Sequence, residues 1–271
     1  MLTSKQLLDI KELQQACEAN ESFELKLNWE MLNERPENET NDFLHYEDGQ
    51  LVGFIALYGF GNKVELCGMV HPEFRRKGIF TELYHTALQA VNERGFTQIL
   101  LNAPSNSQSA KKFLQTIPCS YAFSEHQMKW EEKDLSENEE VKLRLSTPDD
   151  FELEVQLNVQ CFGFKEDEAR EYNRRPRWDM DQYYIVMSGE KSVGKMRISR
   201  TDGEAWIYGF AILPEYQGQG IGRKALTNAV IKEHQTGFPI FLEVEAKNAN
   251  ALRLYESIGF RAYHSQDYYE K

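Results

Sequence analysis

The sequence repeats itself when it is shifted by 142 positions, and this internal repeat restricts the possible folds more than any other feature. Nine of 42 positions are identical, without a gap, between residues 72–113 and residues 214–255. Ordinary residue frequencies would give about three identities. Upstream, residues 51–53 resemble residues 192–194 with an offset of 141, which indicates a one-residue difference in loop length. The repeat predicts two copies of one domain.

The boundary between the copies is predicted at an acidic segment. Residues 131–140 contain six acidic residues and one apolar residue, Leu135, so we expect a solvated connector there. This divides the chain into a first domain of residues 1–130, the linker 131–140, and a second domain of residues 141–271. A chain of 271 residues is long enough for two domains of about 130 residues each.

Each copy has a mixed α/β pattern of elements. Two strands flank a turn at residues 47–50 in the first copy and at residues 188–189 in the second. A further strand, a glycine-bearing loop, a helix, a short strand and another helix follow in both copies.

Composition limits the class of partner and the compartment. The formal net charge of −12 argues against nucleic acid as a partner. We also expect no membrane association, because no stretch approaches the ~20 apolar residues of a membrane span. The four cysteines form no CxxC pair, which favours reduced thiols in a cytoplasmic protein, and no metal site is expected. A monomer is compatible with the sequence.

A glycine loop in the second copy has the pattern of an anion site. Residues 211–213 end an apolar strand, Pro214 stops it, and glycines at 218, 220 and 222 lead into a helical pattern that starts near Arg223. In such a loop, free amides and the positive end of the helix dipole bind a phosphate. The alternative is a plain strand-to-helix turn. The pattern differs from the motifs for nucleoside triphosphates and NAD.

Two motifs in the second copy resemble one family. Gln217, Gly220 and Gly222 are similar to the Q/R-x-x-G-x-G/A signature of the GNAT superfamily of N-acetyltransferases. The string LEVEAKNANALRLYESIGF, with Asn248 and Tyr255, resembles the family's second signature. The resemblance covers most of residues 141–271. It implies two tandem GNAT domains, each with a mixed, splayed central sheet flanked by helices.

The resemblance also implies a co-substrate and its binding residues. In this family acetyl-CoA lies between two splayed strands. At the matching positions, Gln217 is expected to brace the loop and Asn248 to contact the pantetheine or its phosphate side. The residues expected to bind acetyl-CoA are Phe210, Ala211, Ile212, Gln217, Gly218, Gln219, Gly220, Ile221, Gly222, Arg223, Asn248 and Tyr255.

Two residues are candidates for proton transfer. Tyr255 matches the family's general acid, which protonates the leaving thiolate; the alternative is an aromatic residue of the helix core. Glu243 stands in a Leu-Glu-Val context similar to that of ribosomal-protein acetyltransferases, where the glutamate is the base. Its alternatives are a half-exposed strand carboxylate without a role, or a water chain that replaces it.

The first copy resembles the same family with its motifs eroded. Arg75 and Gly78 fit the first signature, but Phe80 replaces its last small residue. Phe113 and Leu101 occupy the positions of Tyr255 and Glu243, so we expect this copy to be catalytically silent. It could still bind CoA, or it could only wall off the acceptor pocket.

The layout resembles tandem GNAT proteins of the mycothiol synthase type, in which the C-terminal copy does the chemistry. The expected function is direct acetyl transfer from acetyl-CoA to a primary amine, of a small molecule or a peptide N-terminus, in a ternary complex. One alternative is a non-catalytic acyl-CoA-binding or sensor module, which Tyr255 disfavours. Another is a tRNA-dependent aminoacyl transferase of double-GNAT fold, which the acidic charge disfavours.

Overall fold

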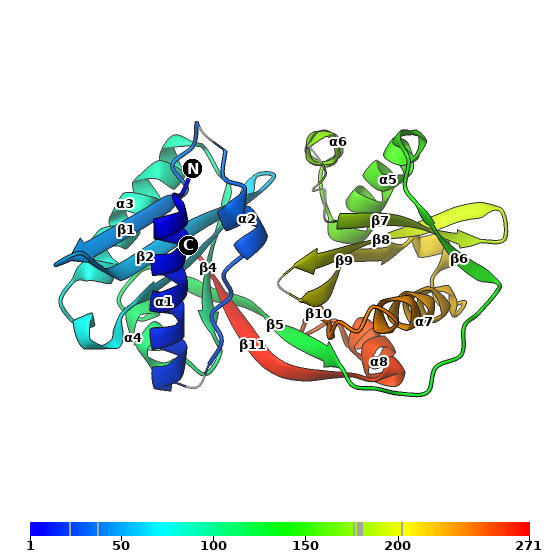
Figure 1. Cartoon of the computed structure of the whole chain (residues 1–271). Coiled ribbons are helices and arrows are strands. Elements are labelled where there is room, and N and C mark those ends of the chain that lie inside the picture. Colours follow the sequence, from blue (N-terminus) through cyan, green and yellow to red (C-terminus); the bar gives the residue numbers. More distant parts are fainter. Residues whose placement is uncertain (22, 37, 176, 178–180, 202) are drawn as a thin grey trace. The chain divides into compact units, whose positions relative to one another are not determined.

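The computed structural model describes residues 1–271 except 22, 37, 176, 178–180 and 202 (Figure 1). The chain forms two compact units. Unit 1 consists of Met1–Ser124 and His264–Lys271, and unit 2 consists of Glu125–Tyr263. Each unit contains a mixed sheet with helices on it, which confirms the predicted α/β fold class.

Unit 1 is built from a first hairpin, a third antiparallel strand and a parallel strand. Its elements are α1 (Ser4–Glu21), α2 (Trp29–Asn33), β1 (Asp42–Glu47), β2 (Gln50–Phe60), β3 (Lys63–Val70), η1 (Pro72–Phe74), α3 (Ile79–Glu93), β4 (Gln98–Pro104), α4 (Gln108–Leu114) and parts of β5 (Ser120–Trp130) and β11 (Phe260–Glu270). The strand order in this unit is β1-β2-β3-β4-β11-β5. The β3–β4 pairing is parallel, and β4 pairs antiparallel with β11.

The sheet of unit 1 is covered on both faces. On one face, α1 buries Ile10, Leu13 and Cys17 against β2 and β3, at the helical spacing that its amphipathic pattern requires. On the other face, α3 and α4 pack over a separate apolar cluster that includes Leu83 and Leu101. Alternate residues of β3 therefore face different helices.

Unit 2 repeats this order of elements after an additional first strand, β6 (Val141–Leu145), and the short helix η2 (Pro148–Asp150). The other elements are α5 (Phe151–Phe162), α6 (Glu166–Arg174), β7 (Asp181–Ser188), β8 (Lys191–Thr201), β9 (Glu204–Ile212), η3 (Pro214–Tyr216), α7 (Ile221–His234), β10 (Ile240–Glu245) and α8 (Ala249–Ile258). The strand order is β11-β5-β10-β9-β8-β7-β6. The largest core cluster lies between the sheet and α7 and α8, and a smaller one lies under α5.

The unit boundaries differ from the boundaries expected from the sequence, because strand pairing and not chain order decides them. Residues 125–129 of β5 pair with β10 and belong to unit 2. Residues 266–270 of β11 pair with β4 and belong to unit 1. The domains expected from the sequence, residues 1–130 and 141–271, instead place residues 125–129 in the first copy and residues 266–270 in the second.

The acidic segment 131–140 is irregular and mostly exposed, but it is attached to unit 2. Leu135 packs against the main core of that unit. The amide N–H of Asn138 donates to Asn228 Oδ1 at 2.9 Å, and Asn228 Nδ2 donates to the Asn138 carbonyl at 2.8 Å.

Candidate functional site

A β-bulge in β9 distinguishes the second copy from the first. Lys195 of β8 pairs with Ala211 and Arg197 pairs with Tyr208, so that Gly209 and Phe210 both face the single residue Met196. Gly209 is exposed and has φ of +56°, a conformation that favours glycine. Bulges bend a strand and re-aim its groups, and they are frequent next to active sites.

The bulge explains the change of offset in the repeat. The hairpin turns have equal length in both copies, because Phe60 pairs with Lys63 and Thr201 with Glu204. In the first copy, β2 and β3 then pair without any shift of register as far as Val70. The expected loop difference is therefore wrong: the additional residue of the second copy lies within β9.

The two parallel strands of each unit separate part-way along their length. In unit 2, β9 and β10 pair at residues 205–207 and 240–242, and both strands continue beyond this point. In unit 1, β3 and β4 pair at residues 63–66 and 98–101 and then separate in the same way. The bulge of β9 lies directly after the point of separation.

The glycine loop joins β9 to α7. Gly218 and Gly220 have φ of +72° and +79°, and a Cβ added at either position would meet open space. Lys224 N donates to Gly220 O at 3.1 Å as the first bond of the helix. The amides of residues 221–223 therefore precede the helical ladder and lie at the positive end of the helix dipole.

Side chains in both copies fix the end of the central strand. Gln217 Nε2 donates to the carbonyl oxygen of Ile212 at 2.8 Å, and the Cys161 thiol of α5 reaches the same oxygen at 3.4 Å. In the first copy, Arg75 Nε at 3.0 Å and the Cys17 thiol at 3.4 Å donate to Val70 O. The sequence reasoning missed the two cysteines, although both precede their strand end by a similar distance in the chain.

A glycine and a phenylalanine exchange places between the copies. A Cβ at Gly222 would lie 3.7 Å from Phe210 Cζ, so the Phe210 ring lies next to the first turn of α7. In the first copy the corresponding residues are Phe80 and Gly68, and a Cβ at Gly68 would lie 3.0 Å from Phe80 Cε2. One aromatic ring fills this space in each copy, but it comes from the strand in one and from the helix in the other.

Tyr255 lies in α8 at the edge of the main core. It is 8% exposed, and its ring meets that of Phe260 edge-on at a centroid distance of 6.2 Å. Burial raises the pKa of Tyr255 to about 12, so the phenol stays protonated at neutral pH. It can therefore donate a proton, but it cannot serve as a base.

Glu243 lies on β10 opposite Gln127 of β5. Gln127 Nε2 donates to Glu243 Oε1 at 3.1 Å. Gln127 itself is 7% exposed, and no group in the described part of the chain donates to its Oε1. The carboxylate of Glu243 is thus held in one orientation by a buried amide.

Asn248 has a structural task that the sequence reasoning did not include. It is the N-cap of α8, where its Oδ1 accepts from Ala251 N at 3.1 Å. Among the other predicted residues, Ala211 and Ile212 are buried at the end of β9, Gln219 donates to the Glu215 carbonyl at 2.9 Å, Ile221 is buried and Arg223 is exposed.

A polar cluster beneath α5 was also missed. Lys195 of β8 donates to Asn158 Oδ1 at 2.5 Å, and burial lowers the pKa of Lys195 to about 8. The buried carboxylate of Glu154 accepts from Arg177 at 2.8 Å nearby. Because Lys195 pairs with Ala211, the cluster lies one residue beyond the bulge. No sequence motif connects these residues.

Metal sites and membrane-spanning helices are absent from the part of the chain that the structure describes. No group of three or more His, Cys, Asp or Glu side chains there could hold a metal ion. Nor does any described helix have the length and apolar character needed to cross a membrane.

The sequence and the fold were compared with known proteins. The chain is 25% identical over 264 residues to the mycothiol acetyltransferase of Nocardiopsis dassonvillei, across 83% of this chain and 80% of that protein. It is 43% identical over 58 residues to the [ribosomal protein bS18]-alanine N-acetyltransferase of Escherichia coli, across 21% of this chain. That match spans 39% of the length of the Escherichia coli protein.

A solved structure shares the fold across nearly the whole chain. The GCN5-related N-acetyltransferase from Sphaerobacter thermophilus superposes with a TM-score of 0.76 at 19% identity, over 97% of this chain and 91% of that chain. The model of the Acetyltransferase (GNAT) family matches residues 7–116 and 152–260. These segments fall on the two copies of the repeat and together cover more than half of the sequence. The chain therefore belongs to the acetyltransferase (GNAT) family and carries two copies of its domain in tandem.

Proposed function

We propose that the second copy transfers an acetyl group from acetyl-CoA to a primary amine, either of a small molecule or of a peptide N-terminus. The observation that carries this proposal is the bulge at Gly209 and Phe210, which the second copy has and the first lacks. The printed names of the relatives, mycothiol acetyltransferase and ribosomal-protein alanine N-acetyltransferase, are both consistent with acetyl transfer to an amine.

The residues of the loop suit a diphosphate. Open space above Gly218 and Gly220 lets a phosphate approach the backbone, where the amides of residues 221–223 donate to it. Beyond Ile207 the edge of β9 is no longer paired with β10, so its backbone can receive an extended amide-bearing arm. When bound, acetyl-CoA supplies a thioester that an amine attacks directly.

The protein's own groups then handle two protons. The carboxylate of Glu243, oriented by Gln127, takes the proton of the attacking amine. The phenol of Tyr255 gives its proton to the departing thiolate. Because burial raises the pKa of this phenol to about 12, it keeps its proton until the thiolate forms.

The proposal is tested by measuring amine-stimulated release of the CoA thiol, together with calorimetric binding of acetyl-CoA. We expect Tyr255→Phe to lower kcat by about 10²–10⁴-fold while the affinity for acetyl-CoA is retained. Tyr121→Phe, which changes an exposed tyrosine of unit 1, is the matched control and should behave as the wild type.

A second variant tests the loop. Gly220→Val forces a branched residue into a backbone with φ of +79°, so acetyl-CoA binding should be lost. Retained affinity in Gly220→Val would refute the assignment of the loop. If no amine stimulated thiol release by a wild-type protein that binds acetyl-CoA, the acetyltransferase function would be replaced by the sensor function.

A further inference from the structure

The side of α5 that packs on the sheet of unit 2 carries polar side chains. Glu154, Asn158 and Cys161 recur there at helical spacing, and Glu154 and Asn158 are buried. An amphipathic helix normally turns apolar residues toward its sheet. Lys195 of β8 meets this side of the helix, where its Nζ donates to Asn158 Oδ1 at 2.5 Å. The polar cluster beneath α5 is therefore unusual for the place where a helix packs on a sheet.

The first copy has an apolar helix residue at the position of Glu154. Cys17 of α1 and Cys161 of α5 reach the end of the central strand in their own copies. Seven residues before them in the chain stand Ile10 and Glu154. Ile10 is buried in an apolar cluster of unit 1. The second copy thus has a carboxylate where the first copy has a core isoleucine.

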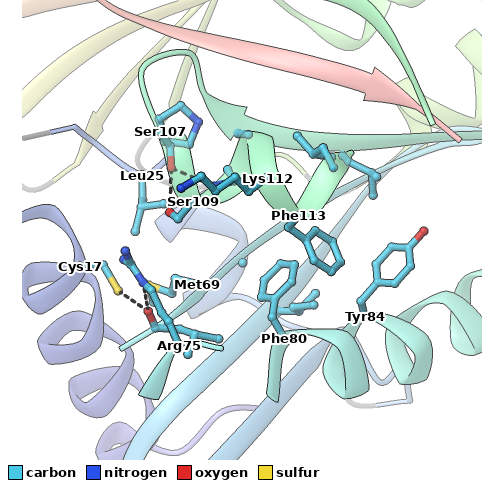
Figure 2. A pocket seen from close by; sticks show the side chains of 18 of the residues that line it. Cys17, Leu25, Met69, Arg75, Phe80, Tyr84, Ser107, Ser109, Lys112 and Phe113 are labelled. Atoms are coloured by element: carbon cyan, nitrogen blue, oxygen red, sulfur yellow. Dashed lines mark hydrogen bonds between the residues drawn. The ribbon is translucent and has the colours of Figure 1, made fainter. Parts of the chain in front are cut away.

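The strand beneath the helix shows the same difference. Phe54 pairs with Met69 in unit 1 as Lys195 pairs with Ala211 in unit 2, so Phe54 holds the position of Lys195. Phe54 and Met69 are both buried in the apolar cluster that contains Cys17, and Figure 2 shows Met69 and Cys17 in the wall of the unit 1 cavity. Burial of a charge costs free energy, and the first copy folds without one here. The charges of the second copy therefore point to a ligand.

The charges of the cluster do not balance. Glu154 accepts from Arg177 at 2.8 Å and from the Ser146 hydroxyl at 2.5 Å. Among the described residues, no carboxylate lies within ion-pair distance of the Lys195 amine. One more anionic group would neutralise the cluster.

The hydrogen bonds of the cluster lack an acceptor. A protonated lysine has three N–H donors, and Lys195 uses one of them, on Asn158 Oδ1. Asn158 Nδ2 donates in turn to Asn173 Oδ1 at 2.9 Å. Asn173 Nδ2 is buried and has no acceptor in the described part of the chain. Both amide oxygens are occupied while donors remain, so the missing partner is a hydrogen-bond acceptor.

Lys195 and Glu243 lie on the same face of the sheet. Their chain neighbours Met196 and Leu242 belong to the main core beneath α7 and α8, so alternation along each strand places Lys195 and Glu243 on the face of α5. Because β8 and β10 flank β9, the backbones of the two residues are about 10 Å or more apart. An acceptor that reaches both residues has several bonds between its amine and its anionic group.

We infer that the polar cluster beneath α5 binds a carboxylate of the acceptor, several bonds from the nitrogen that is acetylated. The inference rests on the proposed function and names its substrate class. The carboxylate accepts from Lys195 Nζ and Asn173 Nδ2 while the amine lies at Glu243. A short peptide and an ω-amino acid share this chemistry, whereas a polyamine lacks it.

The test compares acetyl transfer to acids with transfer to their amides, which have nearly the same shape but no negative charge. The probes are glycylglycine, 6-aminohexanoate and glycine, each with its amide. In the two longer pairs kcat/KM should be about 10–100-fold higher for the acid, chiefly through KM. The glycine pair should show no preference, because its carboxylate is too close to the amine. A larger preference in the dipeptide pair identifies a peptide, and a larger one in the aminohexanoate pair identifies an ω-amino acid.

The outcomes separate this inference from the proposed function. Equal kcat/KM for acid and amide in both longer pairs would overturn the inference and leave the acetyltransferase function intact. Transfer to other amines but to none of these acids would overturn it as well. Absence of transfer to every amine would refute the proposed function itself.

Variants assign the preference to the cluster. Lys195→Met should lower the ratio of acid to amide by about tenfold or more, whereas a general loss of stability would slow both probes alike. Asn173→Ala should lower the ratio to a smaller extent. Lys191→Met, at an exposed lysine of the same strand, is the matched control and should keep the wild-type ratio. An unchanged ratio in Lys195→Met would contradict the assignment.

The pH dependence of the preference tests the folded wild-type protein. Burial lowers the pKa of Lys195 to about 8; its titratable neighbours are Glu154, Cys161 and Arg177, and the residues opposite it on β7 and β9 carry no charge. Since kcat/KM reports the free protein, the preference for the acid should fall about tenfold between about pH 7 and pH 9, as the amine loses its proton. Lys195→Met at the same pH values corrects for the different basicity of acid and amide. A constant preference across this range would show that Lys195 does not bind the carboxylate.

Discussion

Lys195 links the geometry of the candidate site to the pH dependence of stability. Its amine is close to the Glu154 carboxylate, the Cys161 thiol and the Arg177 guanidinium, but burial is the largest influence and lowers its pKa from 10.5 to about 8. Between these two values the unfolded chain binds more protons at this position than the folded chain does. The free energy of unfolding should therefore rise as the pH increases from about 8 to about 10.5.

Lys195→Met should remove this rise. The contribution at stake is about 3.5 kcal/mol across the window, because the shift is about 2.5 pKa units and one unit corresponds to about 1.4 kcal/mol. Urea unfolding at a series of pH values measures it as the difference between wild type and variant. Lys191→Met, at an exposed lysine of the same strand, is the control and should leave the pH profile unchanged. If the unfolding free energies of Lys195→Met and the wild type changed with pH in parallel, the Lys195 amine would be shown to titrate at its ordinary pKa in the folded protein.

Single residues differ in how well the sequence predicts their place. Gly218 and Gly220 could be identified because glycine is the residue that most readily adopts a positive φ, and Gln217 because it belongs to a signature next to them. Lys195 and Gln127 could not be identified from the sequence. Lys195 acquires its environment only when α5 packs on β8, and Gln127 only when β5 pairs with the distant strand β10.

At the level of elements, the bulge accounts for the asymmetry between the copies. Deleting Gly209 would give β9 the length of β3. Side chains on both sides of the deletion would keep their faces, since residues 205, 207, 210 and 212 already face one side of the sheet. We therefore expect the deletion variant to fold and to lose at least about 100-fold in acetyl transfer, because the backbone beside the point of strand separation is re-aimed.

Circular dichroism and urea unfolding test the fold of this variant, and thiol release tests its activity. Deletion of Gly203, in the turn between β8 and β9, is the matched control for the removal of one glycine. The Gly203 deletion should lower the free energy of unfolding, but it should lower the rate of acetyl transfer much less than the Gly209 deletion does. Full activity of the Gly209 deletion would remove the principal support for the proposed function.

The exchange of Phe210 and Gly222 makes a prediction about how β9 packs on α7. Gly222→Phe alone overfills the space and should cost about 1–3 kcal/mol. Phe210→Gly alone leaves a cavity and should cost about 3 kcal/mol or more. The double variant copies the arrangement of Gly68 and Phe80 in the first copy, so its loss should be smaller than the sum by about 1–2 kcal/mol.

A double-mutant cycle of urea unfolding free energies measures this coupling. Gly222→Ala is the control, since a Cβ there lies 3.7 Å from its nearest neighbours and should be tolerated. Strictly additive losses would show that the two positions pack independently.

The element order was predictable from the sequence, but the position of the additional residue was not. Turn glycines and alternating apolar residues predicted both hairpins and the strand, loop and helix that follow. An offset of one residue looks the same in sequence whether it falls in a loop or in a strand. Only the register of β8 against β9 identifies it as a bulge at Gly209.

For the whole molecule, the repeat correctly predicted two copies of one domain. The acidic composition of residues 131–140 placed the boundary between the copies there, but the folded units divide the chain elsewhere, after Ser124 and after Tyr263. Local sequence cannot report which strand β5 and β11 will pair with, because those partners lie more than 100 residues away along the chain. This pairing makes the C-terminal residues part of unit 1.

Removal of residues 264–271 should therefore unfold unit 1 in preference to unit 2. Tyr268 is 1% exposed, and its hydroxyl accepts from Lys26 at 2.7 Å; Gln266 donates to the Glu24 carbonyl at 3.0 Å. Loss of the strand exposes this surface and leaves the edge of β4 unpaired over residues 100–104. Hydrogen exchange should show deprotection of β2 and β4, while α7 and β9 stay protected.

Attaching residues 264–271 to residues 1–130 should restore the fold of unit 1. Residues 1–130 should remain largely unfolded alone and should gain a cooperative unfolding transition when residues 264–271 are attached through a flexible linker. The matched control carries Tyr268→Ala in the attached strand, which removes a buried aromatic side chain worth about 3–5 kcal/mol and should abolish the gain. A stable fold of residues 1–130 without the strand would mean that chain order, and not strand pairing, defines the folding unit.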